Sequence, residues 1–215
     1  MTPEFSLLVN PIVRRTIDLV DRVRVGTAEL KETRGDLKSL LDQADRQAAS
    51  SGSRVRADEW NLSKRVLVFW LDEVLTAANP QWQSITLEWE YYATRDRAWR
   101  FYYDWETEAK RTSTPNVAEL WYLCLVLGFE GDIGNAFAEH LNTPIPVGIS
   151  AEDFRRQWAG DLARLIVPLE SRALEKIPLQ GTIEPLAWDS RLWDAVRWAA
   201  VLLVITLVLY FIPKS

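Results

Sequence analysis

Apolar residues recur every three to four positions along most of the chain, a spacing that predicts helices rather than strands. No segment alternates apolar and polar residues over a sustained length, and no Asn-Gly or Asp-Gly pair marks a hairpin. The pattern therefore predicts an all-α protein of about seven to eight helices. The expected helices cover about 11–25, 28–49, 58–78, 82–94, 95–111, 115–127, 132–141 and a stretch that begins at 150.

The helix expected at 115–127 is apolar almost all round, which predicts that it is the central helix of the core. Thr114 and Pro115 form the favoured start of a helix, with an N-cap residue followed by proline in the first turn. Gly128 is a plausible C-cap, and Phe129 is expected to fold back over the helix end as the hydrophobic contact of that cap.

Residues 198–212 form a run of fifteen uncharged residues near the C-terminus. At 1.5 Å per residue they cover roughly 23 Å, and an extension back to Trp193 brings the length close to the ~30 Å of a hydrocarbon core. Trp193 and Trp198 stand at one end and Tyr210 at the other, as interfacial aromatic residues do, and Arg197 can snorkel to the interface. We expect a transmembrane anchor over 191–212, with a buried core helix as the alternative.

This anchor sets the expected domain organisation and topology. A helical domain covers 1–170, a linker 171–190, the anchor 191–212 and a short periplasmic tail 213–215. Basic residues are concentrated on the N-terminal side of the anchor, which predicts a cytoplasmic helical domain under the positive-inside rule. The first residues lack the basic leader and long apolar run of a signal peptide, in agreement with that orientation.

Composition excludes several function classes. One Cys and one His leave no multi-Cys or paired-His zinc motif, and nine Gly form no phosphate-cradling cluster. A net charge of -5 argues against nucleic-acid binding. We therefore predict no metal, cofactor or nucleic acid. The eleven Trp predict large buried aromatic contacts.

Candidate catalytic groups are few. Cys124 lies within a wholly apolar helix, where burial raises the pKa of a thiol and makes it inert. His140 follows Glu139 directly, and neighbouring helical residues point about 100° apart. Asp72 and Glu73 diverge for the same reason, so they are poorly placed to act on one bond. These features argue against an enzyme.

The helix expected at 58–78 carries a polar stripe on an otherwise apolar surface. Two interpretations of this stripe stay open, a solvated face and a face that docks a partner. Its members are Asp58, Asn61, Arg65, Asp72 and Thr76.

The string YLCLVLGFEG, from Tyr122 to Gly131, resembles the YxCLxLGFxG signature of the TssL/DotU family, also called IcmH. Leu71-Asp72-Glu73 resembles the family's "DE" helix, about fifty residues earlier. The chain departs from the family pattern at 96–102 and directly after Gly131, which marks it as a divergent member.

The resemblance implies a structural, non-enzymatic inner-membrane subunit of a type VI, or related type IVB, secretion system. It implies a cytoplasmic all-helical domain made of two packed sub-bundles, followed by one C-terminal transmembrane helix. The implied partners are a TssM/IcmF-like inner-membrane protein, a baseplate component such as TssK and a complex that contains TssJ, and self-association is a further expectation.

The resemblance also assigns roles to residues. It implies that Asp72 and Glu73 dock partners. The residues of the signature are expected to maintain the fold, and they are Tyr122, Cys124, Gly128, Phe129 and Gly131. Two alternatives stay open: a tail-anchored helical adaptor outside secretion, and a membrane-tethered hydrolase.

Overall fold

The computed structural model describes residues 1–50, 52–112 and 114–174, and all regular secondary structure within these ranges is helical. The chain divides into two compact units, Met1–Lys176 and Ile177–Ser215, and the described residues belong to the first. Its elements are α1 (Pro3–Arg24), α2 (Leu30–Ala48), α3 (Ala57–Ala78), η1 (Pro80–Ser84), α4 (Leu87–Tyr92), α5 (Arg97–Asp104), η2 (Trp105–Ala109), α6 (Lys110–Thr112), α7 (Pro115–Val126), α8 (Ile133–Asn135), η3 (Ala136–His140) and α9 (Ala151–Leu174).

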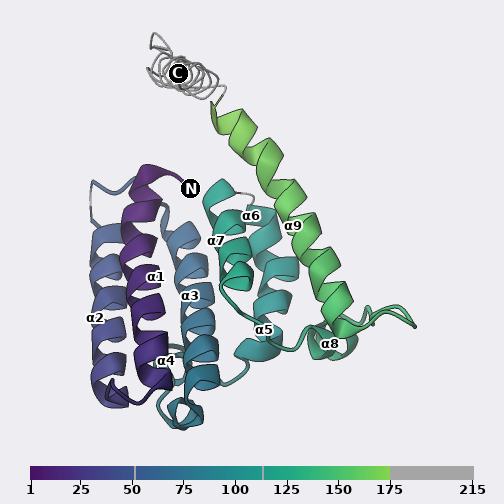
Figure 1. Ribbon diagram of the computed structural model, residues 1–215. Coiled ribbons are helices and arrows are strands. Elements are labelled where there is room, and N and C mark those ends of the chain that lie inside the picture. The colour runs from purple at the N-terminus through teal and green to yellow at the C-terminus, as the bar shows by residue number, and fades with distance from the viewer. Residues whose placement is uncertain (51, 113, 175–215) are drawn as a thin grey trace, which may run out of the picture. The chain divides into compact units, whose positions relative to one another are not determined.

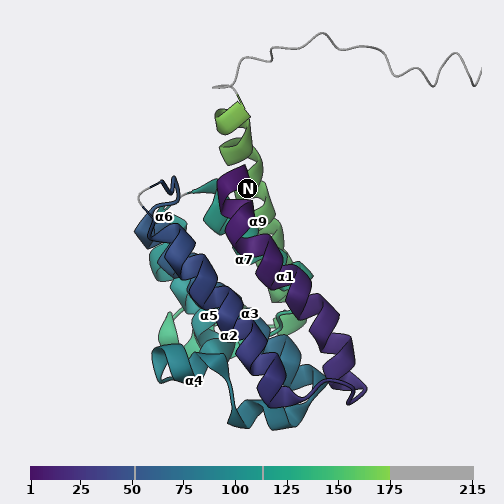
Figure 2. The ribbon, with the colours of Figure 1, turned by 90° about the vertical axis from the view of Figure 1, so that its left-hand side faces the viewer.

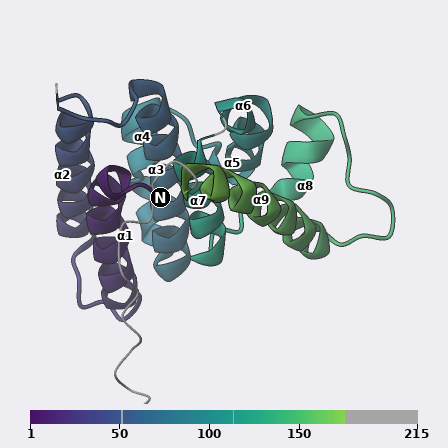
Figure 3. The same cartoon turned by 90° about the horizontal axis from the view of Figure 1, so that it is seen from above.

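The helices of this unit form two groups that share α3. Helices α1, α2 and α3 pack against one another, and α1 and α2 face the viewer in Figure 2. On its other side α3 contacts α5 and α7, and α9 packs along α7 (Figures 1 and 3). The all-α prediction is therefore confirmed for the described residues.

Helix α3, rather than α7, is the most deeply buried element. Its interior side chains cover most of its circumference, as its apolar pattern predicts, and they include Trp60, Val66, Phe69, Trp70 and Leu71. The prediction that 115–127 is the central core helix is wrong. Val126 on α7 is 63% exposed, whereas α3 contacts α1, α2, α5 and α7 and so lies at the centre of the unit.

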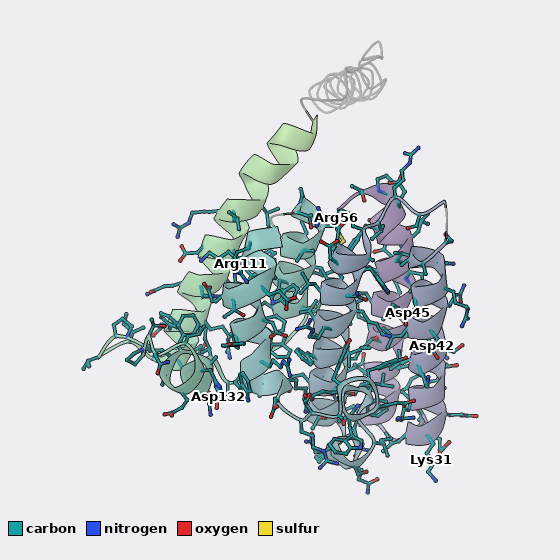
Figure 4. All side chains as sticks on the ribbon, turned by 180° about the vertical axis from the view of Figure 1, so that it is seen from behind. Lys31, Asp42, Asp45, Arg56, Arg111 and Asp132 are labelled. Atoms are coloured by element: carbon teal, nitrogen blue, oxygen red, sulfur yellow. The ribbon has the colours of Figure 1, made fainter. Side chains whose placement is uncertain are left out.

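Polar side chains join α2 to α3 and α4. Asp45 accepts hydrogen bonds from Trp60 Nε1 (2.8 Å) and Lys64 Nζ (2.6 Å), and Asp42 accepts one from the Tyr91 hydroxyl (2.7 Å). Figure 4 labels both aspartates on α2. These contacts fix the α2 side of the first group.

Helix α1 begins eight residues earlier than the apolar pattern predicts. Thr2 caps it, because the Thr2 hydroxyl accepts the Phe5 N–H (3.4 Å), and Pro3 occupies the first turn. Pro11 lies inside the helix. Its missing N–H would have bonded the carbonyl of Leu7, whose residue is 71% exposed, so water can satisfy that carbonyl.

Three of the predicted helices are interrupted. The stretch 82–94 divides into the 3₁₀ turn η1 and α4, which ends at Ala93 with a left-handed φ of 52°. The stretches 95–111 and 132–141 each contain a π-helical turn, η2 and η3. The spacing of apolar residues in these segments cannot predict where a helix changes to the 3₁₀ or π form.

The predicted anchor, with Trp193, Arg197, Trp198 and Tyr210, lies outside the described residues, as does most of the predicted linker. Helix α9 continues to Leu174, which places its last turn in the segment expected to be linker. No helix within residues 1–174 combines the length and the apolar character that a bilayer span needs.

Candidate functional site

The Asp72 carboxylate is completely buried, and three N–H groups bind it. Its Oδ1 accepts from Trp82 Nε1 (2.7 Å) and from the backbone N–H of Leu87 (3.0 Å), and its Oδ2 accepts from the N–H of Glu88 (2.6 Å). Leu87 and Glu88 are the first residues of α4. Asp72 therefore acts as an N-cap that α3 supplies to another helix, and it satisfies donors that lack partners within α4.

Burial raises the pKa of the Asp72 carboxyl above its ordinary value, while the N–H donors and the Arg97 charge act against that shift. Because the carboxylate is bound by three donors and closed off from solvent, its oxygens cannot accept a hydrogen bond from a partner at the surface. Its side chain is therefore organised to hold the corner formed by η1 and α4.

A second buried carboxylate, Glu88, organises the turn that follows α4. Its Oε1 accepts the backbone N–H of Asp96 (2.6 Å) and Arg97 (2.9 Å) and the hydroxyl of Thr94 (3.1 Å). Burial raises the pKa of this carboxyl, and the Arg97 guanidinium opposes that rise.

The Arg97 guanidinium connects these groups. Its Nε bonds to Glu73 Oε2 (3.1 Å), and its terminal nitrogens reach Glu88 (3.4 Å), Thr76 (3.2 Å) and Gln83 (3.0 Å). A planar guanidinium with five donors suits such a junction, and the paired carboxylates offset the cost of burying its charge. The network joins α3, η1, α4 and α5.

Glu73 links this network to the signature string. Its Oε1 accepts the backbone N–H of Gly131 (3.2 Å), while its Oε2 takes the Arg97 bond. The side chain of Glu73 is 23% exposed, so it lies at the edge of the network rather than inside it. The two segments that carry the family resemblance are thus in direct contact.

The turn after α7 is a Schellman motif. Phe129 N–H bonds to the Cys124 carbonyl (3.0 Å) and Gly128 N–H to the Leu125 carbonyl (3.1 Å), and Gly128 has a φ of 97°. Phe129 is buried and its ring stacks on Phe101 at 4.0 Å between centroids. The predicted C-cap and the folded-back Phe129 are both confirmed.

Gly131 sits where a side chain does not fit. Its φ is 55°, and a Cβ there would lie within 3 Å of the Ala98 carbonyl oxygen and of the Phe129 ring. Two further contacts hold the segment, since Ala98 accepts the Asp132 N–H (2.6 Å) and Glu130 accepts the Tyr102 hydroxyl (2.6 Å). Figure 4 labels Asp132 at this turn.

The remaining predicted residues lie apart from this network. Cys124 is buried, and burial raises the pKa of its thiol, as the apolar context predicts. Tyr122 is half-buried and lines a hollow beside α9. His140 lies at the surface, where its ring stacks on Trp99 with centroids 3.5 Å apart. Among the residues that the structure describes, no group of three or more His, Cys, Asp or Glu could hold a metal ion.

Sequence reasoning selected Asp72 and Glu73 but missed the groups that complete the network. Glu88 and Arg97 lie in segments of mixed aromatic and charged residues, where no spacing marks them as partners of α3. The sequence did mark the segment that contains Arg97, because 96–102 departs from the family pattern, but it did not indicate a contact with α3.

A family model described as "Type VI secretion system protein DotU" matches residues 5–213 of the chain. No curated protein and no solved structure matches it.

Proposed function

Because the chain belongs to the DotU family and is therefore a type VI secretion system component, we propose that residues 191–212 hold it in the bacterial inner membrane, where its helical unit docks other subunits. The proposed partners are a TssM/IcmF-like protein, a baseplate component such as TssK and a TssJ-containing complex. The family match favours this role over an adaptor outside secretion and over a membrane-tethered hydrolase.

The observation that carries the proposal is the extent of the family match. It runs through both the helical unit and the apolar run at 198–212, so the two parts belong to one family pattern. An anchored domain meets its partners at a raised effective concentration, which allows modest docking surfaces to act.

For the docking surface we propose the corner that Asp72 and Glu73 organise, rather than the Asp72 side chain alone. Asp72 contributes by fixing η1 and α4, and Glu73 contributes at the edge, where it holds the Gly131 backbone. A network that fixes three chain turns gives a partner a preformed surface, which lowers the entropic cost of binding.

Membrane fractionation tests the anchor. We expect the full chain to resist extraction by alkaline carbonate and to need detergent, and we expect a chain that ends at residue 190 to appear in the soluble fraction. A chain that ends at residue 212 is the control and should behave as the full chain does. Release of the full chain by carbonate would refute the anchor.

Co-purification tests the docking surface. We expect Glu73→Gln to weaken recovery of the TssM/IcmF-like or TssK-like partner while the protein stays folded by circular dichroism. Glu139→Gln, at an exposed position away from the network, is the control. Unchanged recovery of both partners with Glu73→Gln would remove Glu73 from the docking surface.

A further inference from the structure

The outer face of α7 is apolar where a surface helix is ordinarily polar. Tyr122, Leu123, Val126 and Leu127 follow one another at the spacing of a single helical face, and Val126 is 63% exposed. The other three side chains are half-buried. One exposed valine beside three half-buried apolar side chains leaves room for an apolar side chain of another protein to pack on this face.

A hollow of about 200 Å³ opens between this face and α9. Its volume suits one or two side chains rather than a drug-sized ligand. Helix α9 packs against α7, and the two lie side by side when seen from above (Figure 3). The lining consists of apolar groups on the α7 side and arginines on the α9 side, from Tyr122, Leu125, Val126, Phe129, Arg155, Arg156 and Ala159.

Arg155 is a half-buried cation that pairs with no carboxylate in the part of the chain whose side chains are described. Its guanidinium donates to the Glu130 carbonyl oxygen (3.3 Å) and interacts with the Tyr102 hydroxyl. No carboxylate among the described side chains (1–50, 52–111 and 114–166) forms an ion pair with it, whereas its neighbour Arg156 pairs with Glu152 and Asp153. A partly desolvated charge in this position favours the approach of an anion.

In two other hollows of the unit, the half-buried arginines are paired with carboxylates. In the hollow between α1 and α2, the half-buried Arg15 pairs with Asp36, and the other arginine of the lining, Arg14, is exposed. In the hollow beside α3 and α4, Arg65 and Arg100 both pair with Asp104, at 2.9 and 3.5 Å. The α7–α9 hollow thus combines an apolar floor with a half-buried arginine that has no ion pair to any described carboxylate.

From this combination we propose that the α7–α9 hollow docks an amphipathic helix of a partner protein. A bulky aliphatic side chain of the partner rests on Val126, and an Asp or Glu one turn away bonds to Arg155. Residues one turn apart share a helix face, so one helix supplies both groups. This inference rests on the proposed role as a docking subunit, and it adds a surface distinct from the corner of Asp72 and Glu73.

Fluorescence anisotropy with the full chain in detergent tests the proposal. The probe is a labelled 16-residue helical peptide with Leu along one face and Glu beside it. Two matched peptides replace Glu by Lys or Leu by Ala. We expect the Leu/Glu peptide to bind at least about tenfold more tightly than either matched peptide, since both the apolar and the charged contact contribute.

Variants locate the binding. We expect Val126→Asp and Arg155→Gln each to weaken the Leu/Glu peptide about tenfold or more, and Arg155→Glu to shift the preference toward the Leu/Lys peptide. Leu7→Asp, at an equally exposed apolar position on α1, should leave binding unchanged. Circular dichroism confirms that each variant is folded.

Equal binding of the Glu and Lys peptides, or equal loss with Leu7→Asp, would overturn the proposal. Binding to a second copy of the chain would also overturn it, and light scattering of the peptide-free protein detects that outcome. Carbonate extraction of the same variants separates this result from the proposed anchor, because a failed hollow leaves membrane retention unchanged.

Discussion

At the scale of single residues, the buried carboxylate of Asp72 illustrates how one side chain orders several segments. It only accepts hydrogen bonds, and each of its three partners only donates. An uncapped α4 would leave two backbone N–H groups buried without acceptors, which costs about 1–3 kcal/mol for each group. The carboxylate of Asp72 therefore stabilises the start of α4.

We expect Asp72→Asn to lower the free energy of unfolding by about 1–3 kcal/mol, because the amide NH₂ would face a donor instead of accepting from it. Urea denaturation measures the change. Asp58→Asn, on the same helix with a side chain that is 62% exposed, should stay within about 0.5 kcal/mol of the wild type. An Asp72→Asn variant that unfolds at the wild-type urea concentration would contradict the capping role.

The thiol of Cys124 gives a second prediction at this scale. Because it is buried and its pKa is raised, we expect labelling by a disulfide reagent at pH 8 to be at least about a hundredfold slower than in guanidinium. Rapid labelling of the native protein would show that α7 opens locally.

At the scale of elements, the turn after α7 depends on two glycines for different reasons. Gly128 has open space around it and needs only its positive φ. Gly131 needs its positive φ and the absence of a Cβ as well, since the Ala98 carbonyl and the Phe129 ring fill that space. Ala98 belongs to α5, which lies far from the turn in sequence, whereas Phe129 is part of the turn itself.

We therefore expect Gly131→Ala to destabilise the protein more than Gly128→Ala does. The backbone term of about 1–2 kcal/mol is common to both, and overpacking adds about 1–3 kcal/mol at Gly131. Thermal unfolding of the two variants side by side measures the difference. Equal melting temperatures would mean that the turn moves away from α5 without cost.

These elements also show what the sequence could predict. Helix type followed from apolar spacing, and the Gly128 cap from local chemistry, because both are set within a few residues. The break near Ala93 was predicted to within two residues, whereas the break between η1 and α4 and the π turns η2 and η3 were missed, since tertiary contacts decide them. The bond between Glu73 and Gly131 joins positions 58 residues apart, a separation that apolar spacing does not address.

At the scale of the whole molecule, the core of the described unit draws on residues from Phe5 to Ile166. The chain divides after Lys176. We expect a fragment that ends at Lys176 to fold alone and to melt within about 3 °C of the full chain, because its buried apolar contacts are already complete. Calorimetry of the fragment checks this, and failure to melt cooperatively would show that residues 177–215 contribute to the core.

The indole groups of the interior supply a further consequence. Among the described residues, five indoles donate from Nε1 to an acceptor on another element or turn, and they are Trp60, Trp70, Trp82, Trp121 and Trp158. Each bond joins a different pair of segments. The five indole N–H resonances in a nitrogen–proton NMR spectrum would therefore each report on the packing of one such pair. A binding event that loosens one junction would broaden or shift its own resonance and leave the other four in place.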